Sequence, residues 1–176
     1  TSNRPLSLRE ALEDCAEGAT GISGIVDQLL SISEAESGTA NLKLETCDVP
    51  RLIKEVLEIY EFVALEKSIR VELDVEPSRF LWRLDLKKTK QAVANLLDNA
   101  IKFSPEGSKI SIRARNDDDR LTISVIDEGI GISAEDLPQI WDRLFRGDRS
   151  RTAPGSGLGL SIVRAVVTAH GGKVGA

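Results

Sequence analysis

Two asparagines and a lysine recur on one side of an expected helix in the stretch NLLDNAIKFS, residues 95–104. Asn99 follows Asn95 by four residues and Lys102 comes three later, so the three side chains lie within an arc of about 60°. Asparagine is a poor helix former because its side chain competes for backbone hydrogen bonds. The ordinary explanation is that this side of the helix is a polar face in contact with solvent. Two neutral amide oxygens one turn apart are also ligands that Mg²⁺ accepts while it keeps waters and nucleotide phosphates, and the lysine could meet a phosphate.

Two glycine patterns follow this helix. DEGIGIS (127–133) comes directly after an expected strand, where Asp127 supplies a carboxylate and Gly129 and Gly131 let the backbone approach a flat ligand. GSGLGLS (155–161) opens the last helix, whose first N–H groups could hold phosphate oxygens. The second pattern is neither a P-loop nor a dinucleotide fingerprint, because it lacks the G-K-[ST] ending and follows no strand. Taken alone, each pattern is also compatible with an ordinary turn or a flexible linker.

Four arginines lie between the two glycine patterns, in IWDRLFRGDRSRTAP (140–154): Arg143, Arg146, Arg149 and Arg151. Such a segment is most often a solvated loop. A loop that closes over a nucleotide has the same composition, since arginine pairs well with a terminal phosphate.

The apolar pattern predicts the elements that carry these residues. Asp85 is expected to be the N-cap of the asparagine helix. Helices are expected over four segments: 50–67, 86–103, 134–141 and 158–170. Strands are expected at 69–75, at 80–85, in a hairpin over 108–127 and at the start of the closing GGKVGA. This order predicts an α+β domain.

The first forty residues have a different character. From Leu8 to Leu29 apolar residues recur at alternating steps of four and three, which is the seam of a coiled coil or a helical bundle. Gly18, Gly21 and Gly24 weaken that helix by roughly 1 kcal/mol each relative to alanine, so it needs a partner helix from this chain or a second copy. Gly38 predicts the helix end and the start of a linker.

Composition narrows the class of protein. The 176 residues are 41% hydrophobic, enough for a full core. Residues 1–40 carry two of the 23 basic and seven of the 28 acidic side chains, so the net charge of −5 lies entirely there. This balance argues against a nucleic-acid partner. Cys15 and Cys47 have no metal or redox spacing and suit a reducing cytoplasm. No membrane span or signal peptide is visible.

Taken in order, the asparagine helix, the D-x-G-x-G turn, the arginine loop and the G-x-G-L-G segment resemble the N, G1, F and G2 boxes of sensor histidine kinases. These kinases belong to the GHKL superfamily of ATP-binding domains. NLLDNAIKFS, DEGIGI and GSGLGLSIV are close to the wording typical of the family, with Trp141 in place of the usual Phe. The resemblance implies a two-layer α/β sandwich, a mixed sheet with three helices, preceded by a long bundle helix.

The resemblance also implies a division of the chain. Residues 1–40 would be the second helix of a dimerisation and histidine-phosphotransfer bundle with its linker. Residues 41–176 would be the ATP-binding catalytic domain, with its C-terminal strands cut short. The longer protein would be a homodimer through the bundle. This chain would lie in the cytoplasm, either as part of a soluble kinase or as the cytoplasmic part of a membrane receptor.

The family's roles pass to matching positions of the asparagine helix. Asn95 and Asn99 would hold Mg²⁺ on ATP, Lys102 would touch phosphate and Phe103 would lie near adenine. Asn95 stands where the gyrase-type and chaperone-type branches keep a glutamate base. An amide cannot accept a proton, and a histidine kinase needs no such base because the neutral imidazole of the acceptor is itself the nucleophile.

The family's other roles fall on the later motifs. Asp127 would read the adenine amino group. The floor of the site would be shaped by Gly129, Gly131 and Ile132. Arg143 and, as the better candidate, Arg146 would meet the γ-phosphate. The lid and phosphate cradle would be framed by Gly155, Gly157, Leu158 and Gly159. The expected catalytic residues are Asn95, Lys102 and Arg146.

The family's acceptor histidine lies in an H-E-x-x-x-P-like motif that does not occur in this sequence. The only histidine, His170, is expected to be a helix-dipole partner or a surface residue. We therefore expect an ATP-dependent protein-histidine kinase whose acceptor lies on a helix outside this chain, with relay to a response-regulator aspartate. The alternatives are a GHKL ATPase that works by conformational change and a nucleotide-binding dimerisation module without kinase activity.

Overall fold

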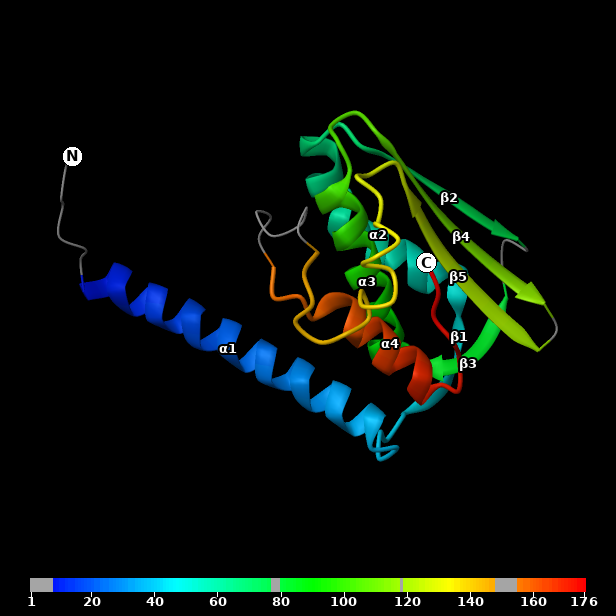
Figure 1. The fold of residues 1–176 in the computed structure, drawn as a ribbon, viewed down its shortest axis with the longest axis horizontal. Coiled ribbons are helices and arrows are strands. Elements are labelled where there is room, and N and C mark those ends of the chain that lie inside the picture. Colours follow the sequence, from blue (N-terminus) through cyan, green and yellow to red (C-terminus); the bar gives the residue numbers. More distant parts are fainter. Residues whose placement is uncertain (1–7, 77–79, 118, 148–154) are drawn as a thin grey trace.

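The computed structural model describes residues 8–76, 80–117, 119–147 and 155–176 (Figure 1). Its helices are α1 (Leu8–Glu36), α2 (Val49–Glu66), α3 (Leu86–Phe103) and α4 (Gly159–Ala169). Its strands are β1 (Leu44–Asp48), β2 (Arg70–Glu76), β3 (Leu81–Asp85), β4 (Lys109–Asp117) and β5 (Arg120–Asp127).

The strands form two sheets. The larger has the order β2-β4-β5, with β2 parallel and β5 antiparallel to β4, so it is a mixed sheet. In the smaller sheet β1 pairs antiparallel with β3. Helices α2 and α3 pack on one face of the larger sheet and α4 packs on α3 (Figure 1). The expected architecture, a mixed sheet layered with three helices, is confirmed.

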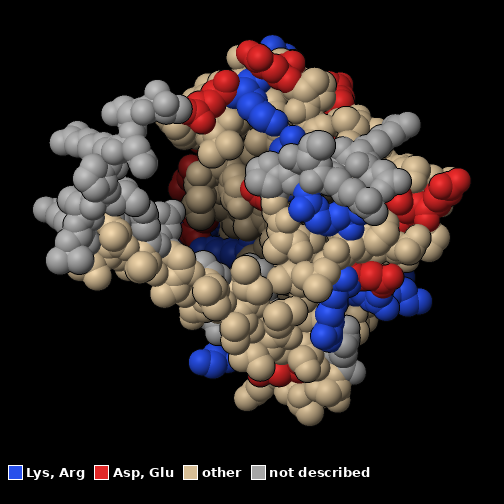
Figure 2. Space-filling view, turned by 60° about the vertical axis from the view of Figure 1, so that its left-hand side comes forward, with Lys and Arg blue, Asp and Glu red and all other residues tan. Residues whose placement is uncertain are grey.

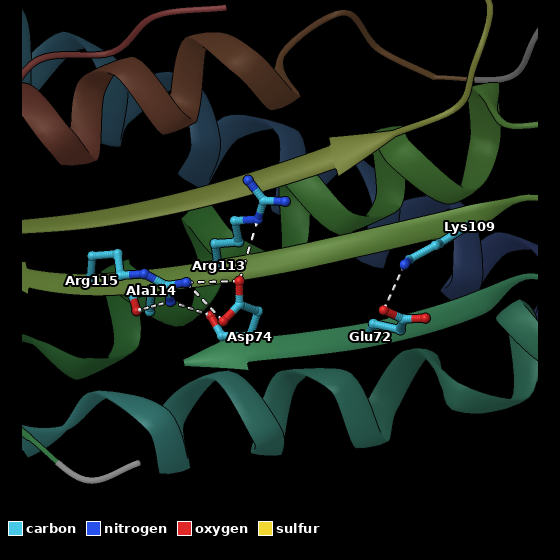
Figure 3. Close-up of polar contacts among 6 residues, drawn as sticks. All are labelled: Glu72, Asp74, Lys109, Arg113, Ala114 and Arg115. Carbon is cyan, nitrogen blue, oxygen red and sulfur yellow. Dashed lines mark hydrogen bonds and ion pairs between the residues drawn. The ribbon is translucent and has the colours of Figure 1, made fainter. Parts of the chain in front are cut away.

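Alternation along β4 explains which face of the sheet is covered. Ile110, Ile112 and Ala114 are fully buried and point toward the helices. The alternate residues of β4 point to the opposite face, where Lys109 pairs with Glu72 at 2.7 Å and Arg115 pairs with Asp74 at 2.7 Å (Figure 3). These half-exposed pairs contribute little stability, but they keep this face of the sheet solvated.

The buried side chains form two clusters that meet at α3. One lies between the larger sheet, α2 and α3 and includes Leu52, Ile53 and Leu97. The other joins α3, α4 and the end of α1, and includes Ile32 and Ile162. Helix α3 contributes to both clusters. Its polar side, which carries Asn95, Asn99 and Lys102, is therefore held in a fixed orientation.

Helix α1 contacts the rest of the molecule only near its C-terminal end among the described side chains. Ile32 is 2% exposed and packs in the α4 cluster with Leu29, whereas Leu12 is 61% and Ile22 66% exposed. The exposed residues belong to the apolar seam, so most of the seam has no cover in this structure. Among the described helices, none is long and apolar enough to cross a membrane.

Two expectations about local structure are wrong, and one strand has no counterpart among the expected elements. Residues 134–141 form successive turns and no regular helix, because Pro138 has no N–H to donate. The short strand β1 was not expected, since its LETCD sequence is mostly polar. The closing residues 172–176 form no strand, and Val174 instead packs against the α4 cluster.

Asp85 is the N-cap of α3, as expected. Its carboxylate is buried and accepts hydrogen bonds from the N–H of Lys88 at 3.0 Å and the N–H of Lys43 at 2.9 Å. Burial by itself would raise the pKa of Asp85, but these two hydrogen bonds, with the charge of Lys88, lower it below its ordinary value. The cap therefore ties the start of α3 to the segment that follows α1.

This lowered pKa predicts how stability depends on pH. Since the folded pKa lies below the unfolded one of about 3.9, the Asp85 carboxylate stabilises the fold above about pH 4, and this contribution is lost as the pH falls through the folded pKa. Asp85→Asn is expected to lower the free energy of unfolding at neutral pH and to flatten its decline below about pH 4. Urea unfolding across pH tests this, with the exposed Asp119→Asn as control. Equal acid declines in Asp85→Asn and the unsubstituted chain would contradict it.

Candidate functional site

The two asparagines of α3 face the beginning of α4. Both side chains are half-buried. A Cβ placed on Gly159, the first residue of α4, would lie 3.4 Å from Asn95 Oδ1 and 3.7 Å from Asn99 Nδ2. The amide pair and a helix N-terminus are thus side by side. Helix N-termini favour anions and amide oxygens favour hard cations, so the pair suits a bound metal–phosphate group.

Lys102 extends from the last turn of α3 toward Gly155. Its Nζ lies 4.8 Å from the centroid of the Phe103 ring, and a Cβ on Gly155 would come within 2.7 Å of this nitrogen. Burial lowers the pKa of Lys102, the carboxylate of Asp98 opposes the shift and the positive charge of Arg146 adds to it. The positive charges of Lys102 and Arg146 therefore repel each other, and a bound anion would offset that repulsion.

The structure separates the two candidate arginines. Arg146 is half-buried and acts on Lys102, whereas Arg143 lines a cavity of about 410 Å³ on another side of α4. That cavity also borders Ile32 of α1 and Trp141. Arg149 and Arg151 lie outside the described residues.

The D-x-G-x-G loop is fastened to the end of α3. The N–H of Gly129 donates to Asp127 Oδ1 at 2.9 Å, and the N–H of Ile130 donates to the carbonyl of Phe103 at 3.3 Å. Gly131 has a φ of +68°, a conformation that glycine adopts freely. Ile132 is 46% exposed beyond it. The loop thus brings Asp127 close to the backbone of Phe103.

The G-x-G-L-G segment contacts the arginine loop. Gly157 has a φ of +73°, and a Cβ there would lie 2.9 Å from the carbonyl carbon of Leu144 and 3.0 Å from the carbonyl oxygen of Phe145. Leu158 is fully buried in the α4 cluster, so any contact it makes with a ligand would come from its backbone. Residues 148–154, between these two segments, lie outside the described residues.

His170 has a structural partner that the sequence did not indicate. Its Nε2 accepts the N–H of Asp85 at 2.9 Å and its Nδ1 lies 2.8 Å from the carbonyl of Val166. An accepting Nε2 requires a neutral ring with the proton on Nδ1. His170 therefore joins the end of α4 to the start of α3, which makes it more than the surface or dipole residue expected. This hydrogen bond adds to the apolar packing that holds these two helices together.

Surface charge is mixed on the face of the molecule shown in Figure 2. On the face shown in Figure 2, basic and acidic side chains are interspersed and neither sign gathers into a broad patch. A nucleic-acid surface would present concentrated lysine and arginine. Lys102 and Arg146, whose positive charges act on each other, suit a small phosphate ligand.

A mixed sheet under three helices, with an amide-bearing helix beside glycine turns, defines an ATP-binding domain of the GHKL type. The profile of the family described as histidine kinase-, DNA gyrase B-, and HSP90-like ATPase matches residues 84–176, and the chain belongs to that family.

Two similar proteins are sensor histidine kinases. The chain is 34% identical over 170 residues to the sensor-like histidine kinase SenX3 of Mycobacterium tuberculosis, covering 96% of this chain and 41% of the relative. It is 34% identical over 172 residues to the sensor histidine kinase YkoH of Bacillus subtilis, covering 97% of this chain and 37% of the relative. The chain thus spans less than half the length of these relatives.

Solved structures of histidine kinases have the same fold. Full-length ShkA in complex with AMPPNP has a TM-score of 0.78 and 26% identity, covering 96% of this chain and 36% of that chain. The Acinetobacter baumannii histidine kinase AdeS has a TM-score of 0.71 and 25% identity, covering 94% and 75%. This chain is therefore homologous to the ATP-binding catalytic part of sensor histidine kinases.

Proposed function

We propose that this chain binds Mg–ATP and transfers its γ-phosphoryl group to a histidine on a bundle helix outside the chain, for relay to the aspartate of a response-regulator receiver. The observation that carries the proposal is the convergence of two kinds of group at one place. The amides of Asn95 and Asn99 meet the start of α4, and Lys102 reaches Gly155 with Arg146 nearby. Both arrangements suit a metal-bound triphosphate.

Different residues would bind the phosphate end and the adenine end of the nucleotide. The oxygens of Asn95 and Asn99 would hold Mg²⁺, which would supply charge neutralisation on the phosphates. Lys102 and Arg146 would bind phosphate oxygens and accept the charge that develops during transfer. Phe103 and Asp127 would hold the adenine, the first by its ring and the second by accepting the amino group's hydrogen bond.

Transfer to histidine suits the chemistry of Asn95. A neutral imidazole nitrogen can attack the γ-phosphorus directly, while the bond to the β,γ-bridging oxygen breaks and ADP leaves. Water would need a general base to lose its proton, and the amide of Asn95 cannot serve as one. The enzyme's contribution is then chiefly to position ATP and to neutralise charge.

We further propose that α1 is the second helix of a dimerisation and phosphotransfer bundle. Its exposed apolar side chains, Leu12, Ile22, Ile25 and Val26, need a cover in water. A two-fold bundle of such helices would supply it, and its partner helix would carry the acceptor histidine. Residues 41–176 would then be the catalytic domain that moves against this bundle.

The test combines binding with transfer. We expect calorimetry to show ATP binding that EDTA weakens, and we expect label from γ-³²P-ATP to appear on a histidine-bearing bundle domain of a relative, in an acid-labile form. Rapid steady-state hydrolysis without transfer would instead support an ATPase. Failure to bind any nucleotide would support a dimerisation module.

A further inference from the structure

We infer that Lys67, at the end of α2, is a positioning residue for phosphate recognition, because its ammonium holds the turn of α3 that carries Lys102. The inference rests on the proposed ATP site and adds to it a residue that does not line the site. None of the sequence motifs includes Lys67.

The geometry of Lys67 is that of a cap supplied from another helix. Its Nζ donates to the carbonyl of Ile101 at 2.8 Å and to the carbonyl of Lys102 at 3.2 Å, and the side chain is half-buried. The last carbonyls of a helix have no partner within the helix. The N–H that Ile101 would ordinarily use belongs to residue 105, which is proline and has none. Lys67 supplies this donor.

Other hydrogen bonds also hold the end of α3 in place. The carbonyl of Phe103 accepts the N–H of Ile130, and the N–H of Ser104 donates to Ala100. The backbone carbonyl of Lys67 accepts the N–H of Gly107 at 3.0 Å, so Lys67 is joined to the segment after α3 by its backbone as well. A positive charge at a helix C-terminus is also favoured by the helix dipole.

The hydrogen bonds from Lys67 and from Ile130 act on different parts of the site. Lys67 holds the carbonyls of Ile101 and Lys102, whereas the N–H of Ile130 holds Phe103 independently. Loss of the ammonium would leave two part-buried carbonyls without this donor and loosen the turn that directs Lys102 toward Gly155. Phosphate binding would suffer more than adenine binding, because small displacements of a charged group are costly at a preorganised site.

The experiment compares ATP with adenosine. Lys67→Met keeps the side-chain length and removes the donor; we expect the Kd of ATP to rise about tenfold, the scale of one charged hydrogen bond, and that of adenosine to change by less than about twofold. Lys67→Arg should restore most of the ATP affinity. Lys54→Met, which replaces an exposed lysine of the same helix, is the matched control and should leave both affinities unchanged.

A double-variant cycle separates positioning from general stability. If Lys67 acts through Lys102, then Lys67→Met should have little further effect on ATP binding in a Lys102→Met background. Equal losses for ATP and adenosine, or fully additive effects, would overturn the inference. Should Lys67→Met not fold, Lys67→Gln, which retains an uncharged donor, takes its place in the same cycle.

The outcome also distinguishes this inference from the proposed function. If the unsubstituted chain binds no ATP, the proposed function fails and the inference fails with it. If the chain binds ATP and Lys67→Met binds it equally well, the inference alone is overturned.

Discussion

Replacing Asn99 with alanine is expected to weaken Mg–ATP binding by about 100-fold, which corresponds to losing one strong polar contact to a charged group. The Asn99 amide lies with that of Asn95 against the first residue of α4, so its removal would leave the proposed Mg²⁺ short of a ligand. Alanine is a better helix former than asparagine, so α3 itself should not weaken. The loss would therefore report on binding and not on folding.

Calorimetry with and without Mg²⁺ checks this expectation. In EDTA the difference between Asn99→Ala and the unsubstituted chain should largely disappear, because the proposed contact of Asn99 is to Mg²⁺. Asn41→Ala removes an exposed amide from the segment before β1 and should change nothing. Tight ATP binding that survived both Asn99→Ala and the removal of Mg²⁺ would contradict the site proposed for α3.

Gly129→Ala is expected to destabilise the chain by about 2 kcal/mol and to reduce nucleotide affinity at least tenfold, as overpacking of a tight contact does. A Cβ at Gly129 would come within 2.8 Å of the carbonyl oxygen of Phe103 and 2.6 Å of Asp127 Oδ1. The carboxylate could rotate away, but the backbone of Phe103 can move only with the end of α3. The new methyl group would therefore push the loop off Phe103.

Urea unfolding and adenosine binding measure the two effects of Gly129→Ala. Gly24→Ala is the control, since a Cβ there meets nothing within 4 Å and alanine favours the helix. It should leave nucleotide binding unchanged. A Gly129→Ala variant with the stability and adenosine affinity of the unsubstituted chain would show that the loop does not lie against Phe103.

Features with a local cause could be predicted from the sequence. The limits of α3 follow from the capping side chain of Asp85 and from Pro105 beyond its end, and the hairpin follows from two alternating strands around a turn. The shared face of Asn95, Asn99 and Lys102 follows from helical spacing alone. These features depend on neighbours within a few residues, and such neighbours are present in the sequence itself.

Features that depend on distant partners could not be predicted. Strand β1 exists because it pairs with β3, some forty residues later in the chain. The helix wrongly expected over 134–141 is a different case, because its signal, Pro138, lies within the segment itself. The difference between Arg143 and Arg146 appears only when their surroundings are seen, because both lie in one stretch of the same composition.

The sequence by itself determined the class of this protein, its α3 amide pair and the order of its glycine motifs, because each is a matter of residue type and short spacing. Only the tertiary structure decided that Gly159 lies against the amides, that His170 accepts the N–H of Asp85 at the start of α3 and that Lys67 holds the end of α3. The physical reason is that these contacts join residues from different elements. No periodicity in the chain encodes which helix ends will meet, and packing of the two apolar clusters around α3 brings them together.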